Sequence, residues 1–207
     1  MVAIKYAKGS IALDDSMFLK HHKWTESDGN DGNKLEIVKA ELKQLNLSEM
    51  NLSCSEIVES NMNNSFLTKI DMSDCYFLST SFEEANFSEC LLSKTVFDYA
   101  SLKHTNIRNC VGIKSSFEDA DLSFANISDS DLRRASFRRA NLSYAKFSNV
   151  DLTNALLDGA LLYGTSFEKT IGIGEVSAKH IFVGTQEKSI SLEGDDIKKW
   201  LIEQNKM

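Results

Sequence analysis

The chain has 207 residues, of which 42% are hydrophobic and 26% charged, and its 23 basic and 30 acidic side chains give a formal net charge of -7. The apolar share excludes a chain that stays disordered, and no run of about 18 uncharged apolar residues is present that would span a bilayer. The acidic balance, with a pI near 5.2, argues against a general affinity for nucleic acid.

Residues 1–36 are predicted to form an N-terminal cap and a flexible link. Residues 2–6 and 10–13 suit short strands, residues 17–24 are apolar at intervals, and the DGNDGN sequence at residues 28–33 suits a link. A secretory signal needs an apolar core of roughly 7 to 15 residues. Charged residues interrupt this segment at Lys5, Lys8, Asp14 and Asp15. We therefore expect a cytoplasmic protein.

A strict five-residue repeat dominates the middle of the chain. From Leu42 to Phe167 in steps of five there are 26 positions, and 25 of them carry a large apolar residue, with Gly112 as the exception. A small residue usually stands two positions earlier, often with Asn or Asp between. A helix would repeat every 3.6 residues or so and a strand about every 2 residues. The chain must therefore turn once per unit and wind around an axis with its apolar residues inside.

The phenylalanines indicate how many units close one coil. Among the large inward positions, pairs that lie four units apart occur four times, whereas a pair three units apart occurs once. The four pairs are Phe77 and Phe97, Phe97 and Phe117, Phe117 and Phe137, and Phe147 and Phe167. Four units per coil fit best, and with about 4.8 Å per coil the repeat forms a rod about 31 Å long. At Gly112 we expect a local bulge, with Ile113 turned inward to fill the gap.

The repeat resembles that of the pentapeptide-repeat family, which is defined by tandem A(D/N)LXX units. The sequences ADLSF at residues 120–124 and ANLSY at residues 140–144 give the pattern in full, and the resemblance covers residues 37–171. It implies an all-β fold, a right-handed quadrilateral β-helix, in a bacterial protein. The family includes imitators of duplex DNA that occupy the DNA saddle of gyrase or topoisomerase IV and give immunity to quinolones or peptide toxins. The resemblance implies this role as a candidate.

Residues 172–207 are predicted to form a C-terminal cap, because an open β-helix exposes unpaired backbone at its ends. Residues 180–183 and 189–192 suit two strands around a GTQEK turn. A final helix follows, with Ile197, Trp200 and Leu201 spaced to lie on one side. This side either covers the last coil or forms a homodimer interface, since related proteins pair end to end through such helices.

No catalytic or metal-binding pattern emerges from the titratable residues. His21 and His22 are adjacent and diverge, His104 and His180 are isolated, and no pair of cysteines has the spacing of a zinc site. Cys90 and Cys110 stack one coil apart in the small-residue position, where they act as buried hydrophobic thiols or, by distance alone, reach disulfide range. We predict a protein with no enzymatic activity, metal or cofactor.

The charged residues favour one acidic side of the rod. This side carries Glu56, Glu59, Asp98, Glu118, Asp119 and Asp158. A duplex of about 31 Å carries roughly 18 negative charges, whereas residues 40–170 hold 18 acidic and 12 basic side chains, which leaves a net charge of 12 - 18 = -6. Four arginines resemble a phosphate-binding patch, but the coil stacks Arg138 and Arg139 against Glu118, Asp119 and Asp158. A salt-bridge ladder is thus the main interpretation. The other two of the four arginines are Arg133 and Arg134.

Three rings, those of His104, Phe124 and Tyr144, occupy equivalent outward positions on successive coils. They form either a stabilising stack or an exposed strip where a protein docks. We therefore predict a binding scaffold with a protein partner, without direct binding to nucleic acid or membrane. Protection of gyrase or topoisomerase IV by DNA mimicry is the leading specific hypothesis. A structural or regulatory interaction module with no topoisomerase role is the alternative.

Overall fold

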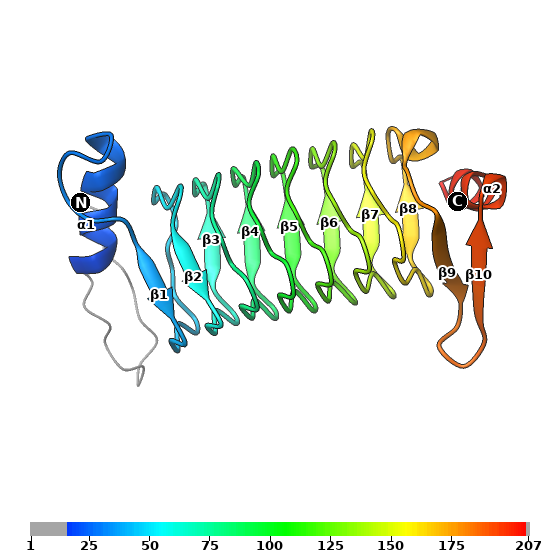
Figure 1. The fold of residues 1–207 in the computed structure, drawn as a ribbon, viewed down its shortest axis with the longest axis horizontal. Coiled ribbons are helices and arrows are strands. Elements are labelled where there is room, and N and C mark those ends of the chain that lie inside the picture. Colours follow the sequence, from blue (N-terminus) through cyan, green and yellow to red (C-terminus); the bar gives the residue numbers. More distant parts are fainter. Residues whose placement is uncertain (1–15, 206–207) are drawn as a thin grey trace.

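The computed structural model describes residues 16–205, which form a β-solenoid of about seven coils with a helix at either end (Figure 1). The strands expected at residues 2–6 and 10–13 lie outside the described residues. The elements, in chain order, are α1 (Ser16–Glu26), β1 (Glu36–Val38), β2 (Glu56–Val58), β3 (Phe66–Thr68), β4 (Asn86–Ser88), β5 (Asn106–Arg108), β6 (Asn126–Ser128), β7 (Lys146–Ser148), β8 (Ser166–Glu168), the short 3-10 helix η1 (Ile173–Glu175), β9 (His180–Gly184), β10 (Ser189–Glu193) and α2 (Asp195–Gln204).

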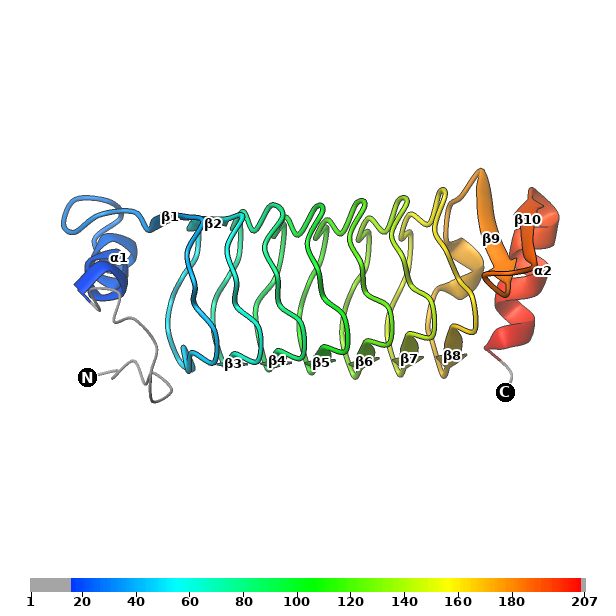
Figure 2. The ribbon, with the colours of Figure 1, turned by 90° about the horizontal axis from the view of Figure 1, so that it is seen from below.

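Each coil contains four five-residue units, as the sequence predicts. Strands β3 to β8 form one parallel six-stranded sheet in which Leu67, Phe87 and Ile107 are register partners on successive coils. Strands β1 and β2 pair on the opposite wall (Figure 2). The remaining walls are joined by isolated parallel bridges, such as Asp121 with Asn141. Backbone pairing therefore holds the coils together on all four walls, and the quadrilateral β-helix is confirmed.

Phenylalanine rings stack along one column of the core. Phe77, Phe97, Phe117 and Phe137 lie on successive coils with ring centroids 5.3, 5.2 and 5.0 Å apart and interplanar angles of 22°, 5° and 3°. All four are at most 1% exposed. Rings at such separations add a specific attraction to the burial of their area. With the large residues inside, only the outward positions are available for binding.

The corners of the coil are turns that place one residue per unit in the left-handed backbone region. His104, Phe124 and Tyr144 have φ values of 57°, 61° and 60°. This conformation costs energy for a residue with a Cβ atom, of order 1 kcal/mol. Hydrogen bonds between coils offset the cost, for example the one that the Phe124 N–H donates to the Ser143 carbonyl at 3.0 Å. The fixed corners project side chains outward at regular intervals along the rod.

The bulge predicted at Gly112 is wrong. The Gly112 N–H donates to the Asp131 carbonyl at 2.7 Å, as in the units around it, and Ile113 lies half-buried on the outside. The gap is filled from the neighbouring coils instead. A Cβ atom on Gly112 would lie 2.8 Å from Leu132 Cδ2 and 3.7 Å from Leu92 Cβ. The two leucines thus close the column without a change in the backbone.

Replacing Gly112 with leucine, which fills the same column in both adjacent coils, is expected to lower the free energy of unfolding by about 1–3 kcal/mol. The added side chain would overpack the space that Leu92 and Leu132 already occupy. Urea unfolding followed by circular dichroism measures the change. A leucine variant as stable as the natural chain would show that the column has room.

The solenoid ends are covered by elements that do not share the repeat. Phe18 and His21 of α1 are buried, and His21 Nδ1 accepts the Leu35 N–H at 3.0 Å. At the other end, the predicted hairpin and helix are present as β9, β10 and α2. Ile197 and Leu201 are 3% and 0% exposed in the single chain, so both face the solenoid.

Candidate binding surfaces on the solenoid walls

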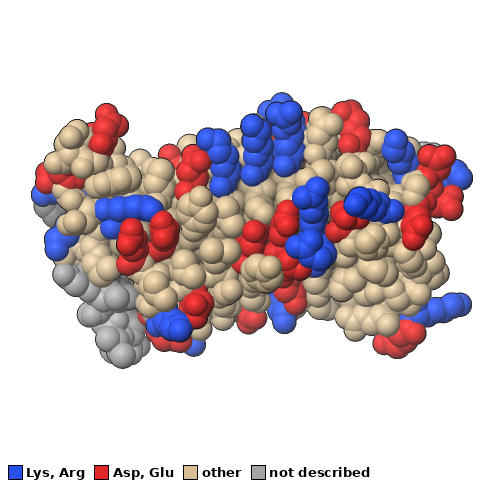
Figure 3. Space-filling view, in the orientation of Figure 1, with Lys and Arg blue, Asp and Glu red and all other residues tan. Residues whose placement is uncertain are grey.

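The six acidic residues predicted to share one side do lie on one wall, called here the acidic wall. They project from the wall of β2 and the bridges that continue it, because their numbers differ by nearly whole coils. This wall faces the reader in Figure 3, where red and blue side chains alternate along the rod. Its members are Glu56, Glu59, Asp98, Glu118, Asp119 and Asp158.

Ion pairs compensate much of the charge on the acidic wall. Arg139 lies 2.7 Å from Asp119 and 3.4 Å from Glu118, and Arg138 lies 3.7 Å from Glu118. The hydrogen bond from Arg139 holds the pKa of the Asp119 carboxyl below its usual range. Farther along the wall, Glu56 pairs with Lys34, and Glu59 lies 3.3 Å from Lys39. The wall is acidic in composition, but its net charge density is well below that of duplex DNA.

The predicted salt-bridge ladder joins only two neighbouring coils, the one with Glu118 and Asp119 and the one with Arg138 and Arg139. Arg138 and Arg139 pair with the preceding coil as expected. Asp158 lies one coil after Arg138 as predicted, since the Arg139 N–H donates to the Asp158 carbonyl at 2.9 Å, but its carboxylate binds other partners. The chain leaves the repeat after residue 171 and passes over the last coil. Asp158 Oδ1 therefore accepts the Lys179 N–H at 2.9 Å and the His180 N–H at 3.3 Å. These backbone donors hold the pKa of the Asp158 carboxyl below its usual range.

The three outward rings form a stack, called here the ring strip (His104, Phe124 and Tyr144). The His104 and Phe124 centroids are 5.0 Å apart at 14°, and those of Phe124 and Tyr144 are 5.0 Å apart at 13°. Phe124 is 48% and Tyr144 42% exposed. The next corner is Gly164, where a Cβ atom would lie 2.7 Å from Tyr144 Cδ1. The glycine leaves space for the Tyr144 ring, which ends the strip.

The structure shows a third surface that the sequence analysis did not identify. Lys94, Lys114 and Arg134 occupy one corner on three successive coils, and we call this row the basic ridge. Basic side chains gather along the upper edge of the middle coils in Figure 3. The signal was present in the sequence, because the three residues are spaced four units apart. Arg134 belongs to the ridge, whereas Arg138 and Arg139 belong to the acidic wall.

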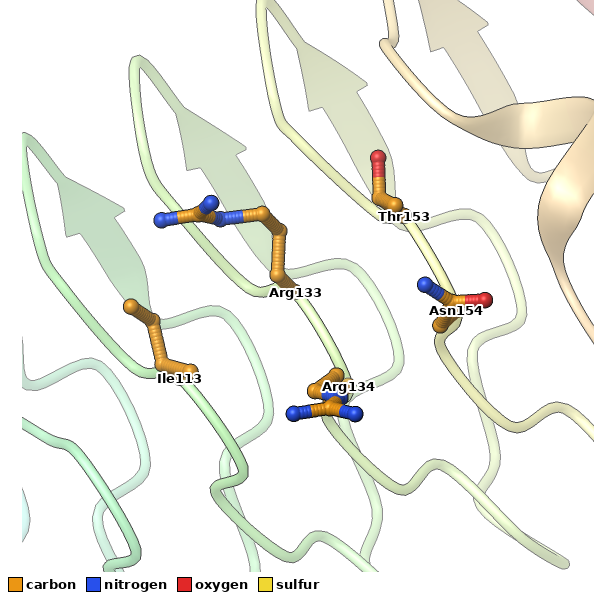
Figure 4. A pocket seen from close by; sticks show the side chains of 5 residues that line it. All are labelled: Ile113, Arg133, Arg134, Thr153 and Asn154. Carbon is orange, nitrogen blue, oxygen red and sulfur yellow. The ribbon is translucent and has the colours of Figure 1, made fainter.

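A groove of about 300 Å³ lies beside the basic ridge (Figure 4). It is lined by Ile113, Arg133, Arg134, Thr153 and Asn154. The Arg133 guanidinium is bound by Asp131, at 2.7 Å, and lies 3.9 Å from Asp151, so its charge is satisfied locally. Arg134 has no ion-pair partner within residues 16–205, and it therefore offers its cation to the groove.

The remaining candidate residues are dispersed. Among residues 16–205, no three His, Cys, Asp or Glu side chains gather closely enough to hold a metal ion. All four cysteines are free thiols, of which Cys54 alone is exposed. Burial raises the pKa of the Cys75 thiol to about 12. No helix in the described part of the chain combines the length and apolar character needed to cross a bilayer.

Comparison with known proteins agrees with this architecture. The family model described as pentapeptide repeats matches the chain in eight copies, over residues 75–111, 115–154 and 145–171. The chain belongs to the pentapeptide-repeat family. No curated protein sequence matches this pentapeptide-repeat chain.

Several solved structures of pentapeptide-repeat proteins are similar to it. A pentapeptide repeat protein from the Arabidopsis thaliana thylakoid lumen is 32% identical over 57% of this chain and 72% of its own, with a TM-score of 0.34. QnrB1, a plasmid-mediated fluoroquinolone resistance protein, is 17% identical over 73% and 95%, with a TM-score of 0.40. HetL from Nostoc sp. strain PCC 7120, involved in heterocyst differentiation regulation, is 17% identical over 78% and 94%, with a TM-score of 0.22. A shared fold does not by itself define the partner.

Proposed function

We propose that this pentapeptide-repeat solenoid is a non-enzymatic scaffold that binds a protein partner through its walls. The observation that carries the proposal is the ring strip, in which Phe124 and Tyr144 remain 48% and 42% exposed although stacked. Exposed aromatic side chains supply large contact area at small entropic cost, which makes them frequent anchors of protein interfaces. The backbone ladder fixes their spacing before a partner arrives, so little ordering is needed on binding.

The specific partner that we propose is a type II topoisomerase, either gyrase or topoisomerase IV, which the protein would protect as an imitator of duplex DNA. The elongated shape, the net charge of -7 and the acidic wall support this choice. The ion pairs on that wall reduce its resemblance to DNA, whereas a homodimer joined through α2 would double its length. Ile202 and Ile190, at 41% and 46% exposed, offer apolar contacts at that end.

A gyrase supercoiling assay tests the topoisomerase proposal. We expect the purified protein to inhibit supercoiling at micromolar concentration or to relieve inhibition by a quinolone. A variant with Phe124 and Tyr144 replaced by alanine shows whether the ring strip takes part, and Phe66→Ala is its matched control. Phe66 is an equally exposed aromatic, at 55%, on the sheet of β3 to β8. No effect on gyrase, together with a monomeric mass by light scattering, would contradict topoisomerase protection.

A second candidate is an interaction module without a topoisomerase role, which the ring strip favours because its rings do not imitate a phosphate backbone. In this case the natural protein leaves gyrase unaffected and still binds a host protein. The Phe124→Ala and Tyr144→Ala double variant would no longer bind the host protein, whereas Phe66→Ala would still bind it. Loss of binding in both variants would contradict a role for the ring strip.

A further inference from the structure

The basic ridge places three like charges on consecutive coils. The N–H groups of Lys94, Lys114 and Arg134 donate to the carbonyls of the next coil at 3.0, 3.0 and 2.9 Å. Neighbouring coils are about 4.8 Å apart. All three residues are exposed. The cations thus form a row along the rod axis.

The ridge is not explained by the stability of the solenoid. At equivalent corners elsewhere, the fold pairs opposite charges, as in Asp119 with Arg139 at 2.7 Å, or a carboxylate with an amide, as in Asp129 with Asn149 at 3.0 Å. Like charges directly opposite each other on neighbouring strands are destabilising. Within residues 16–205, only Lys94 of the ridge has an ion-pair partner, Asp74 at 3.3 Å, and Lys114 and Arg134 have none.

The surroundings of the ridge favour binding of carboxylates. Arg134 opens onto the groove of about 300 Å³, where the Thr153 hydroxyl and the Asn154 amide supply neutral donors on the adjacent coil (Figure 4). Guanidinium and ammonium groups bind carboxylates through charge-assisted hydrogen bonds. The neighbouring acidic wall repels the same ligand. A partner is therefore attracted along one corner only.

We propose that the basic ridge is the docking site for a narrow, carboxylate-rich segment of a partner protein. The inference rests on the proposed function as a protein-binding scaffold and names the chemistry of the segment. A row of three cations spans only about 10 Å, and the acidic wall begins one unit away, at Asp98. A duplex nucleic acid is too wide to contact the ridge without approaching that wall, whereas a single acidic segment fits along it.

Binding of a fluorescein-labelled hexaglutamate peptide, followed by fluorescence anisotropy at low ionic strength, tests the proposal. We expect the Lys114→Gln and Arg134→Gln double variant to bind about tenfold more weakly or worse. The matched control is Lys69→Gln with Lys146→Gln, which removes the same charge from the corner after β3 and from β7 and leaves the ridge intact. Glutamine is compatible with the ridge corners, since Gln44 already has a φ of 59°.

The outcomes test the ridge proposal separately from the proposed function on which it rests. Retained affinity in the control variant, with affinity lost in the ridge variant and thermal stability unchanged, supports the proposal. Equal losses in both variants, or no peptide binding by the natural chain, would overturn it, whatever the gyrase assay shows. Tighter binding of a short DNA duplex, lost in the same ridge variant, would also overturn it and would assign the ridge to nucleic acid.

Discussion

Replacing Phe117 with alanine is expected to lower the free energy of unfolding by about 3–5 kcal/mol. Phe117 is 1% exposed and stacks on Phe97 and Phe137, with centroids 5.2 and 5.0 Å away. Its removal leaves a cavity in the middle of the column and interrupts two ring contacts. Because each coil packs only against its neighbours, the cavity cannot be filled from farther along the rod. Guanidinium unfolding monitored by circular dichroism measures the loss.

Phe124 provides the matched control for this experiment. It also stacks on two rings at 5.0 Å, but on the outside, where it is 48% exposed. Phe124→Ala is expected to cost about 1 kcal/mol or less, because most of the penalty for Phe117 comes from burial and the cavity. Equal effects of the two substitutions would contradict the assignment of the Phe117 column to the core.

Replacing Leu201 with alanine is expected to cost about 2–5 kcal/mol and to promote assembly of the molecule. Leu201 is 0% exposed, on the side of α2 that covers the last coil. The side chain of Asn205 attaches the end of this helix to the backbone of Thr170, with contacts of 2.8 and 2.9 Å. A loosened helix uncovers the edge of the last coil, and an uncovered edge pairs with other chains. Thermal unfolding and size-exclusion chromatography measure both effects.

Ile202, the next residue of α2, serves as the control because it is 41% exposed. Ile202→Ala should leave the thermal stability of the monomer nearly unchanged. If the protein is a dimer through α2, however, this variant lowers the dimer mass without unfolding the chain. A Leu201→Ala variant as stable as Ile202→Ala would contradict the role of α2 as a lid.

The five-residue period was sufficient to predict the coil, because it determines on its own which residues face inward. It could not predict the outcome at Gly112, where Leu92 and Leu132 of adjacent coils decide the packing. It also could not predict the partners of Asp158, since the segment that supplies them lies outside the repeat. Periodicity therefore defines a column, whereas packing between coils and the path of the ends depend on the three-dimensional structure.

The sequence predicted the ring strip, part of the acidic wall and none of the basic ridge, because the contacts between coils depend on the three-dimensional structure. His104, Phe124 and Tyr144 were recognised because rings spaced by one whole coil are conspicuous, and the structure stacks them. The acidic residues were placed on one wall correctly, but their compensation by Lys34 and Lys39 was not predicted, because Lys34 precedes the repeat and Lys39 lies in its first unit. The basic ridge was not predicted, because its cations are 20 residues apart in the sequence and become neighbours only in the coil, whereas Arg133 and Arg134 are adjacent in the sequence.

The pairing of residues that lie four units apart has a consequence for insertions and deletions. A gene duplication that adds one whole coil lengthens the rod and leaves every later side chain on its original wall. Loss of a single unit instead rotates everything downstream by a quarter turn, so that rings, acids and cations move to different faces while the core still packs. Where a wall binds a partner, descendants of this gene should therefore differ in length by multiples of a full coil.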